Sequence, residues 1–172
     1  MVRTKLSRKV RSRKVRKSRS VGRSVGRKQK GGADMFIKYP TFTVDNNTVT
    51  KEAASSVPKI NLDPVNLSTI VMYDPDAAIP QWLHYLVINI PNGDISMGYV
   101  VRPYSGPTPP AGSGTHRYIF EQLEQTDPLF MTIDNPAGFK IDKFRLKYGL
   151  NMKSTKMFRV DTSSAAPAPI TK

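Results

Sequence analysis

The chain contains only two histidines, His84 and His116, and both lie in one segment between Tyr73 and Phe120. The single tryptophan, Trp82, lies in the same segment, together with many prolines and glycines that predict turns. Imidazole N–H groups and aromatic ring edges are suited to contact the oxygen atoms of a phosphate or carboxylate group. These residue types and their spacing therefore favour a small anion-binding site.

Two carboxylates, Asp74 and Asp76, follow a predicted strand, residues 68–73, that is rich in β-branched side chains. Because its negative charge repels an anion, Asp74 is better suited to orient a histidine and to favour the protonated form of that imidazole. His84 lies within the next predicted strand, and His116 begins a later one. If the three strands are neighbours, one carboxylate and two imidazoles converge at one edge of an apolar core.

The elements that must position these groups follow from hydrophobic patterning. The segment from Trp82 to Ile90 predicts a strand that is covered on both faces. One predicted face carries Trp82, His84, Leu86, Ile88 and Ile90, and the other carries Leu83, Tyr85, Val87 and Asn89. Residues 95–101 and 116–123 predict further strands, and residues 141–148 predict a short helix that ends at Gly149. Many short strands, long loops and one late helix indicate a mainly β sandwich.

The formal net charge of +14 comes entirely from the N-terminus. Residues 1–30 hold 14 Lys or Arg and no acidic residue, whereas residues 31–172 hold 13 basic and 13 acidic residues. We therefore predict a disordered basic arm with a Gly-Gly linker over residues 1–33, a neutral domain over residues 34–162, and a flexible tail over residues 163–172. The arm is typical of segments that bind nucleic acid, bind an anionic membrane or direct nuclear import.

The composition also excludes several classes of chemistry. The chain has no cysteine, so disulfides, thiolate nucleophiles and thiolate metal sites are excluded. No apolar run approaches the ~20 residues that span a bilayer, and the N-terminus lacks the apolar core of a secretory signal. We expect an intracellular protein, cytoplasmic or nuclear, with a virion as the alternative location.

Several motifs together resemble one known family. They are Asp-Pro-Asp-Ala at residues 74–77, Trp-Leu-His-Tyr-Leu at residues 82–86, Pro-Pro-x-Gly-x-Gly-x-His-Arg-Tyr at residues 109–118, and Phe-Arg-x-Lys-Tyr at residues 144–148. In this order and spacing, over about residues 57–150, the chain resembles the phosphatidylethanolamine-binding protein family, which includes kinase inhibitors. This chain looks like a short member with a basic N-terminal extension.

The resemblance implies a two-sheet antiparallel Greek-key sandwich with a short C-terminal helix and a small anion pocket. It implies that the ligand contacts Asp74, Trp82, His84, Pro109, His116 and Tyr118. It implies that Pro58 and Pro110 support the pocket, and that Asp76 and Arg117 form a structural ion pair beneath it. Neither a metal nor a cofactor is predicted, since the family uses no metal at this site.

The predicted function is non-enzymatic. No serine lies in a Gly-x-Ser-x-Gly elbow, no nucleophile is recognisable beside the histidines, and Gly112-Ser113-Gly114 is interpreted as a turn. We therefore expect a binding and regulatory protein that recognises a phosphate-bearing group, either a phospholipid head group or a phosphorylated partner protein.

A second interpretation assigns the binding to the arm. In it the protein is a structural component, associated with nucleic acid or with a virion, and residues 34–162 form a scaffold. Short members of the family occur in large DNA viruses, and a repetitive basic segment suits a packaged protein. Protease or kinase inhibition follows only from the family resemblance.

Overall fold

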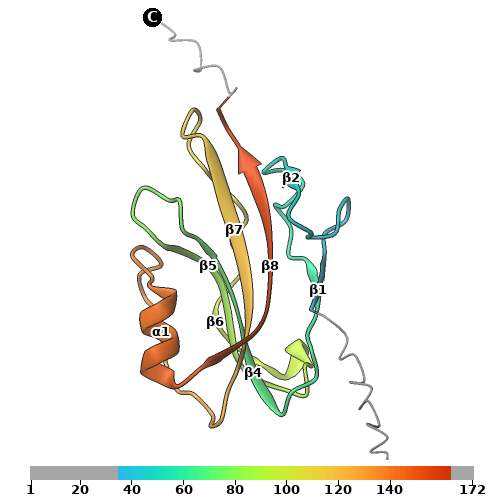
Figure 1. Ribbon diagram of the computed structural model, residues 1–172, viewed down its shortest axis with the longest axis vertical. Coiled ribbons are helices and arrows are strands. Elements are labelled where there is room, and N and C mark those ends of the chain that lie inside the picture. The colour runs from blue at the N-terminus through green and yellow to red at the C-terminus, as the bar shows by residue number, and fades with distance from the viewer. Residues whose placement is uncertain (1–34, 164–172) are drawn as a thin grey trace, which may run out of the picture. The chain divides into compact units, whose positions relative to one another are not determined.

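The computed structural model describes residues 35–163. The predicted arm (residues 1–33) and tail, apart from residue 163, lie outside these residues. The elements are β1 (Phe36–Lys38), β2 (Thr48–Val49), β3 (Lys59–Asn61), β4 (Leu67–Asp74), β5 (Trp82–Pro91), the 3₁₀ helix η1 (Ile95–Met97), β6 (Tyr99–Arg102), β7 (Thr115–Glu124), α1 (Ile141–Tyr148) and β8 (Asn151–Asp161) (Figure 1).

Two sheets are formed. Six strands make the larger sheet in the order β2-β8-β7-β4-β5-β6, and β1 pairs with β3 in the smaller one. Neighbouring strands are antiparallel apart from β2 and β8, which pair in parallel over two residues. The predicted mainly β sandwich is confirmed. The short parallel pair is the one departure, among the described residues, from the expected antiparallel arrangement.

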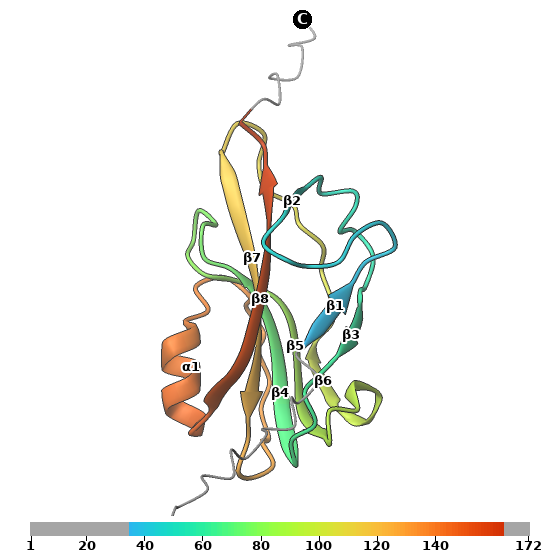
Figure 2. The ribbon, with the colours of Figure 1, turned by 45° about the vertical axis from the view of Figure 1, so that its right-hand side comes forward.

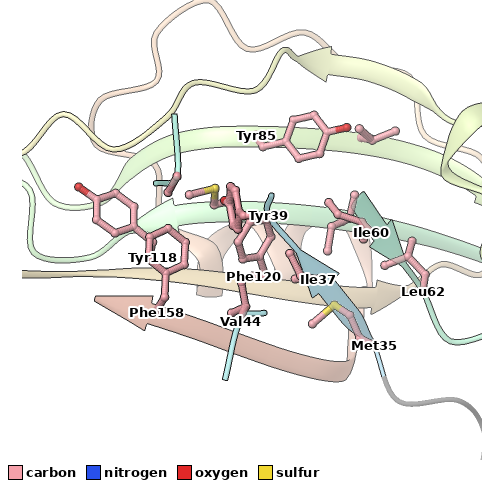
Figure 3. Close-up of a cluster of buried hydrophobic side chains, with 14 of the residues drawn as sticks. Met35, Ile37, Tyr39, Val44, Ile60, Leu62, Tyr85, Tyr118, Phe120 and Phe158 are labelled. Atoms are coloured by element: carbon pink, nitrogen blue, oxygen red, sulfur yellow. The ribbon is translucent and has the colours of Figure 1, made fainter. Parts of the chain in front are cut away.

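The larger sheet has a separate apolar cluster on each face. Figure 2 shows α1 on one side of this sheet and β1 and β3 on the other. On one face, residues of β1 and β3 such as Ile37 and Ile60 pack against Tyr118, Phe120 and Phe158 of the sheet (Figure 3). The other face is covered by α1 and by the segment that precedes this helix. The strands β4 and β5 are therefore buried on both faces, as their apolar composition predicts.

Helix α1 has the predicted bounds. Ile141 and Phe144 lie one turn apart and are the buried residues of the helix, while Gly149 adopts a left-handed conformation (φ 62°) that ends it. In residues 35–163, no helix has the length and apolar character needed to cross a membrane.

The predicted faces of β5 are correct over residues 85–88 and wrong for Leu83 and Ile90, because the strand contains two bulges. Leu83, Leu86 and Ile88 belong to the cluster under α1, whereas Tyr85, Val87 and Ile90 belong to the cluster under the smaller sheet. The pairing with β4 advances by one residue on β4 and by two on β5 at His84, and it slips again before Ile90. Each extra residue reverses the side on which the following side chains lie.

The predicted strand over residues 95–101 is also partly wrong. Its first residues form η1, and only Tyr99–Arg102 are extended. The Asp94 carboxylate accepts a hydrogen bond from the Ser96 backbone N–H at 3.1 Å, so the chain turns before it extends. This local side-chain contact outcompetes the apolar pattern of the segment.

Candidate functional site

A cavity of about 280 Å³ lies where the ends of β4, β5 and β7 meet the loop that precedes β7. The strand order places β4 between β7 and β5, so the three strands that carry Asp74, His84 and His116 are neighbours. Side chains from two loops complete the wall. The lining residues are Asp74, Ala77, Ala78, Ile79, Trp82, His84, Thr108, Pro109, Pro110, His116 and Tyr118.

His84 enters this cavity through the bulge in β5. Its Nδ1 lies 2.8 Å from the Ser105 carbonyl oxygen, and because a carbonyl only accepts, Nδ1 carries the proton. Burial lowers the pKa of His84 below its ordinary value, and the charge on Arg102 acts in the same direction. The ring is therefore neutral near pH 7, and its Nε2 offers a lone pair.

His116 is held from both sides. Its Nδ1–H donates to the Asp74 carboxylate at 2.7 Å, and its Nε2 lies 2.9 Å from the Ser113 hydroxyl oxygen. The other carboxylate oxygen of Asp74 accepts the Asp76 backbone N–H at 2.8 Å. Only 4% of the side-chain surface of His116 and of Asp74 is exposed, so little water competes for this hydrogen bond. Asp74 therefore fixes the ring orientation, as expected for a carboxylate next to a histidine.

Tyr118 supplies a hydrogen-bond donor. Burial raises the pKa of its hydroxyl, and the negative charge on Asp74 raises it further, so the group stays protonated. The ring meets His84 edge to face, with centroids 5.2 Å apart, and stacks on Phe158 at 5.2 Å. The position of the hydroxyl is therefore set by the apolar cluster of the sandwich.

The carboxylate of Asp76 forms an ion pair with Arg117 beside the cavity. The guanidinium donates from Nε and Nη2 to the two carboxylate oxygens at 2.8 Å each, and the Arg117 backbone N–H donates at 3.0 Å. The Arg117 hydrogen bonds hold the pKa of Asp76 below its usual value. Neither residue lines the cavity, and the pair connects the loop after β4 to β7.

All six residues predicted to contact a ligand line the cavity, and so does Pro110. Pro58 does not; it is buried immediately before β3. The apolar residues 77–79, which directly follow the Asp-Pro-Asp motif, also line the cavity and are not among the predicted site residues. The carbonyl of Ser105 is not among them either, because its contact with His84 depends on how the loop closes. Within residues 35–163, no group of three or more His, Cys, Asp or Glu side chains is arranged to hold a metal ion.

The lowered pKa of His84 makes stability depend on pH. Because the folded protein disfavours protonation of this ring, stability is fully present above about pH 6.5, the ordinary pKa of histidine, and is lost as the pH falls below it. Urea unfolding between about pH 5 and pH 8 should show this decline in the wild type and a smaller one in His84→Gln, which retains an N–H donor. If the free energy of unfolding depended on pH in the same way in both proteins, His84 would not be the cause of the decline.

The fold and the cavity define a ligand-binding β-sandwich domain with a small, largely apolar pocket that contains two histidines. A family model described as phosphatidylethanolamine-binding protein matches residues 34–157. The chain therefore belongs to the phosphatidylethanolamine-binding protein family. Membership supports a general role as a ligand-binding regulatory protein, in a family whose members are generally non-enzymatic.

Individual relatives agree with this placement. Putative odorant-binding protein A5 of Drosophila melanogaster is 34% identical over 131 residues, which are 65% of this chain and 62% of that protein. This chain thus spans less than two thirds of that relative.

Among solved structures, the carboxypeptidase Y inhibitor in complex with its cognate proteinase is similar with a TM-score of 0.66 and 23% identity, over 74% of this chain and 82% of that one. A phosphatidylethanolamine-binding protein from Plasmodium vivax is similar with a TM-score of 0.59 and 19% identity, over 74% of this chain and 84% of that one. At these identities the likeness supports the fold.

Proposed function

We propose that the domain binds a phosphate-bearing group, either a phospholipid head group or a phosphorylated residue of a partner protein, in the cavity formed by β4, β5 and β7. The observation that carries this proposal is the meeting of the His84, His116 and Tyr118 side chains in one small cavity. Binding of this kind needs no chemical step and suits a regulatory protein.

The protonation states favour a phosphate that retains one proton. Among residues 35–163, no Lys or Arg lines the cavity, and the neutral His84 ring offers an acceptor at Nε2. A singly protonated phosphate monoester can donate its own P–O–H to Nε2 and accept the Tyr118 hydroxyl. The apolar wall, which includes Ile79 and Trp82, leaves room for the organic part of the ligand.

Titration of the isotope-labelled full-length protein by NMR tests the proposal, with inorganic phosphate in one series and phosphoethanolamine in another. We expect saturable chemical-shift changes at His84 and Tyr118, because both rings contact the ligand. The double replacement His84→Ala with His116→Ala should abolish them, and Ser96→Ala, which alters an exposed serine far from the cavity in sequence, should not.

The two series separate free phosphate from a head group, since only phosphoethanolamine carries an amine. His84→Gln serves as a milder variant that keeps a donor to Ser105. A titration unchanged by the double replacement, in a protein that still unfolds cooperatively, would refute the proposal.

The second candidate function rests on the charge of residues 1–30, which hold 14 basic residues and no acid. In this second function the arm binds DNA or RNA, and the domain makes no contact with the nucleic acid. Affinity for duplex DNA should then fall with salt, with a slope of about −0.9 per phosphate neutralised. It should vanish in residues 34–172 and be unchanged in full-length His84→Ala. DNA binding that survives removal of the arm would exclude this function.

A further inference from the structure

Ser113, His116 and Asp74 form a continuous hydrogen-bonded series that the binding role does not use. The Ser113 hydroxyl oxygen lies 2.9 Å from His116 Nε2, and His116 Nδ1 lies 2.7 Å from the Asp74 carboxylate. This is the arrangement in which a serine is activated by a histidine that a buried carboxylate orients. Such a triad is recognised by geometry and not by position in the sequence.

Ser113 is also accessible. It is exposed, whereas the histidine and the carboxylate behind it are buried. Among the described residues, no heavy atom beyond the adjacent residues lies within 4 Å of the position that a Cβ would occupy at Gly112 or Gly114. The backbone on both sides of the hydroxyl therefore leaves room for a substrate.

A donor for developing negative charge is available next to this serine. Within residues 35–163, the backbone N–H of Gly114 has no hydrogen-bond acceptor, although its carbonyl accepts from Thr162. The N–H of the residue that follows a nucleophilic serine is one of the two backbone N–H groups that stabilise the oxyanion in serine hydrolases of the elbow type.

The Pro110 carbonyl competes for the Ser113 proton, since it lies 2.6 Å from the hydroxyl oxygen. Thr162 resolves this competition. Its single hydroxyl proton reaches the Pro110 carbonyl at 2.9 Å and the Gly114 carbonyl at 3.0 Å, and when it is donated to Pro110 the Ser113 proton is available to His116. Thr162 also holds the loop through its backbone, since its N–H donates to Gly114 at 3.0 Å and its carbonyl accepts from Gly112 at 3.0 Å.

We propose that Ser113 is a nucleophile activated by His116 and Asp74, and that it accepts the acyl group of small carboxylic esters. The Ser113 oxygen forms a bond to the carbonyl carbon while its proton passes to His116 Nε2. The bond to the alcohol oxygen then breaks, and the alcohol leaves with the proton from His116. An acyl group on Ser113 results, and attack by water with the same proton transfers releases the acid. Ser113 itself does not line the apolar cavity, but Pro110 and His116, which both lie within hydrogen-bond distance of its hydroxyl, do line it, so the cavity adjoins the nucleophile and is the place for an apolar substituent of the ester.

A fluorophosphonate probe tests the nucleophile, because it phosphonylates activated serines and remains attached. The full-length protein should gain one adduct, which peptide mass spectrometry should locate at Ser113, and the urea-unfolded protein should gain none. Ser113→Ala should abolish the adduct. Ser96→Ala is the matched control, since Ser96 is exposed and bonded to the Asp94 carboxylate without a histidine, and it should label as the wild type does.

Three further replacements, at Asp74 and Thr162, distinguish activation of Ser113 from its simple exposure. Asp74→Asn should slow labelling about a hundredfold or more, because the histidine loses the carboxylate that orients it. Thr162→Val should slow labelling because Ser113 must then satisfy the Pro110 carbonyl, whereas Thr162→Ser should label normally. Release of p-nitrophenol from p-nitrophenyl butyrate should follow the same order across the variants.

The proposal would be overturned by the absence of a Ser113 adduct under conditions that fully label a reference serine hydrolase. Equal labelling before and after unfolding would overturn it as well, as would equal rates for Thr162→Val and Thr162→Ser. Thermal unfolding of each variant shows whether it folds. If Asp74→Asn does not fold, the labelling rates of wild type, Ser113→Ala and the two Thr162 variants still decide whether Ser113 is an activated nucleophile.

Discussion

Replacing Phe158 with alanine should lower the free energy of unfolding by about 3–5 kcal/mol. The side chain is fully buried on β8 and stacks on Tyr118. It also meets Tyr39 and Phe42 edge to face, with ring centroids 5.7 and 5.6 Å away. Rings that surround one position on several sides relax poorly into the space that the removed ring leaves, so the cost should lie well above that of an average substitution.

Phe130→Ala is the matched control, because 91% of that residue is exposed and its removal should change stability by less than about 0.5 kcal/mol. Urea unfolding of the two variants gives the comparison. A loss below about 1 kcal/mol for Phe158→Ala would show that the aromatic cluster repacks. The same variant should bind phosphate more weakly, since Tyr118 loses the ring on which it stacks (Figure 3).

The sequence predicted those elements that depend on local pattern. The helix over residues 141–148 was found because its apolar residues recur at helical spacing and a glycine follows. The strands at residues 67–74 and 82–91 follow from apolar runs between turn residues, and the strand at residues 115–124 follows from the alternation of its side chains between two faces. The pattern along the chain does not show that these strands are neighbours. The individual pocket residues follow from the family resemblance and not from the pattern.

The features that were missed depend on contacts between distant segments. A bulge changes which face His84 occupies without changing any residue type, so alternation along β5 could not reveal it. Ser113 lies three residues before His116 and was interpreted as part of a turn. Its approach to Nε2 depends on loop closure by Thr162, 49 residues away in the chain. Sequence spacing carries no signal for such a contact.

Gln125 contacts the second bulge of β5 through its side-chain amide. Its replacement should lower the free energy of unfolding more than that of any other polar residue outside the cavity. Its side-chain oxygen accepts the Asn89 backbone N–H at 2.9 Å and the hydroxyl of Thr69. Its amide nitrogen donates to the Asn89 side-chain oxygen at 2.9 Å and to the Asp127 carbonyl at 3.2 Å. Asn89 has a left-handed backbone (φ 57°), so this one amide secures a conformation that few residues adopt readily.

Gln125→Leu should therefore cost about 3 kcal/mol or more, since it leaves the Thr69 hydroxyl and the Asn89 backbone N–H without this partner at about 1–3 kcal/mol each. Glu124→Leu, at the last residue of β7 and next to Gln125 in the chain, is the control. Its exposed carboxylate makes one long ion pair with Lys153 at 3.6 Å, which contributes at most about 1 kcal/mol. Similar losses for the two variants in urea unfolding would show that the Gln125 hydrogen bonds contribute little.

Gln125→Glu separates the donors from the acceptors at this position. The ionised carboxylate keeps the contacts to Thr69 and to the Asn89 N–H but faces the Asn89 side-chain oxygen without a proton. Burial among acceptors raises the pKa of such a group, so the neutral acid is favoured in the folded protein. The variant should lose stability relative to the wild type as the pH rises above about 4.3, the ordinary pKa of glutamate, and recover it on acidification. A difference between variant and wild type that stays constant with pH would show that Asn89 reorients its amide and donates to the carboxylate.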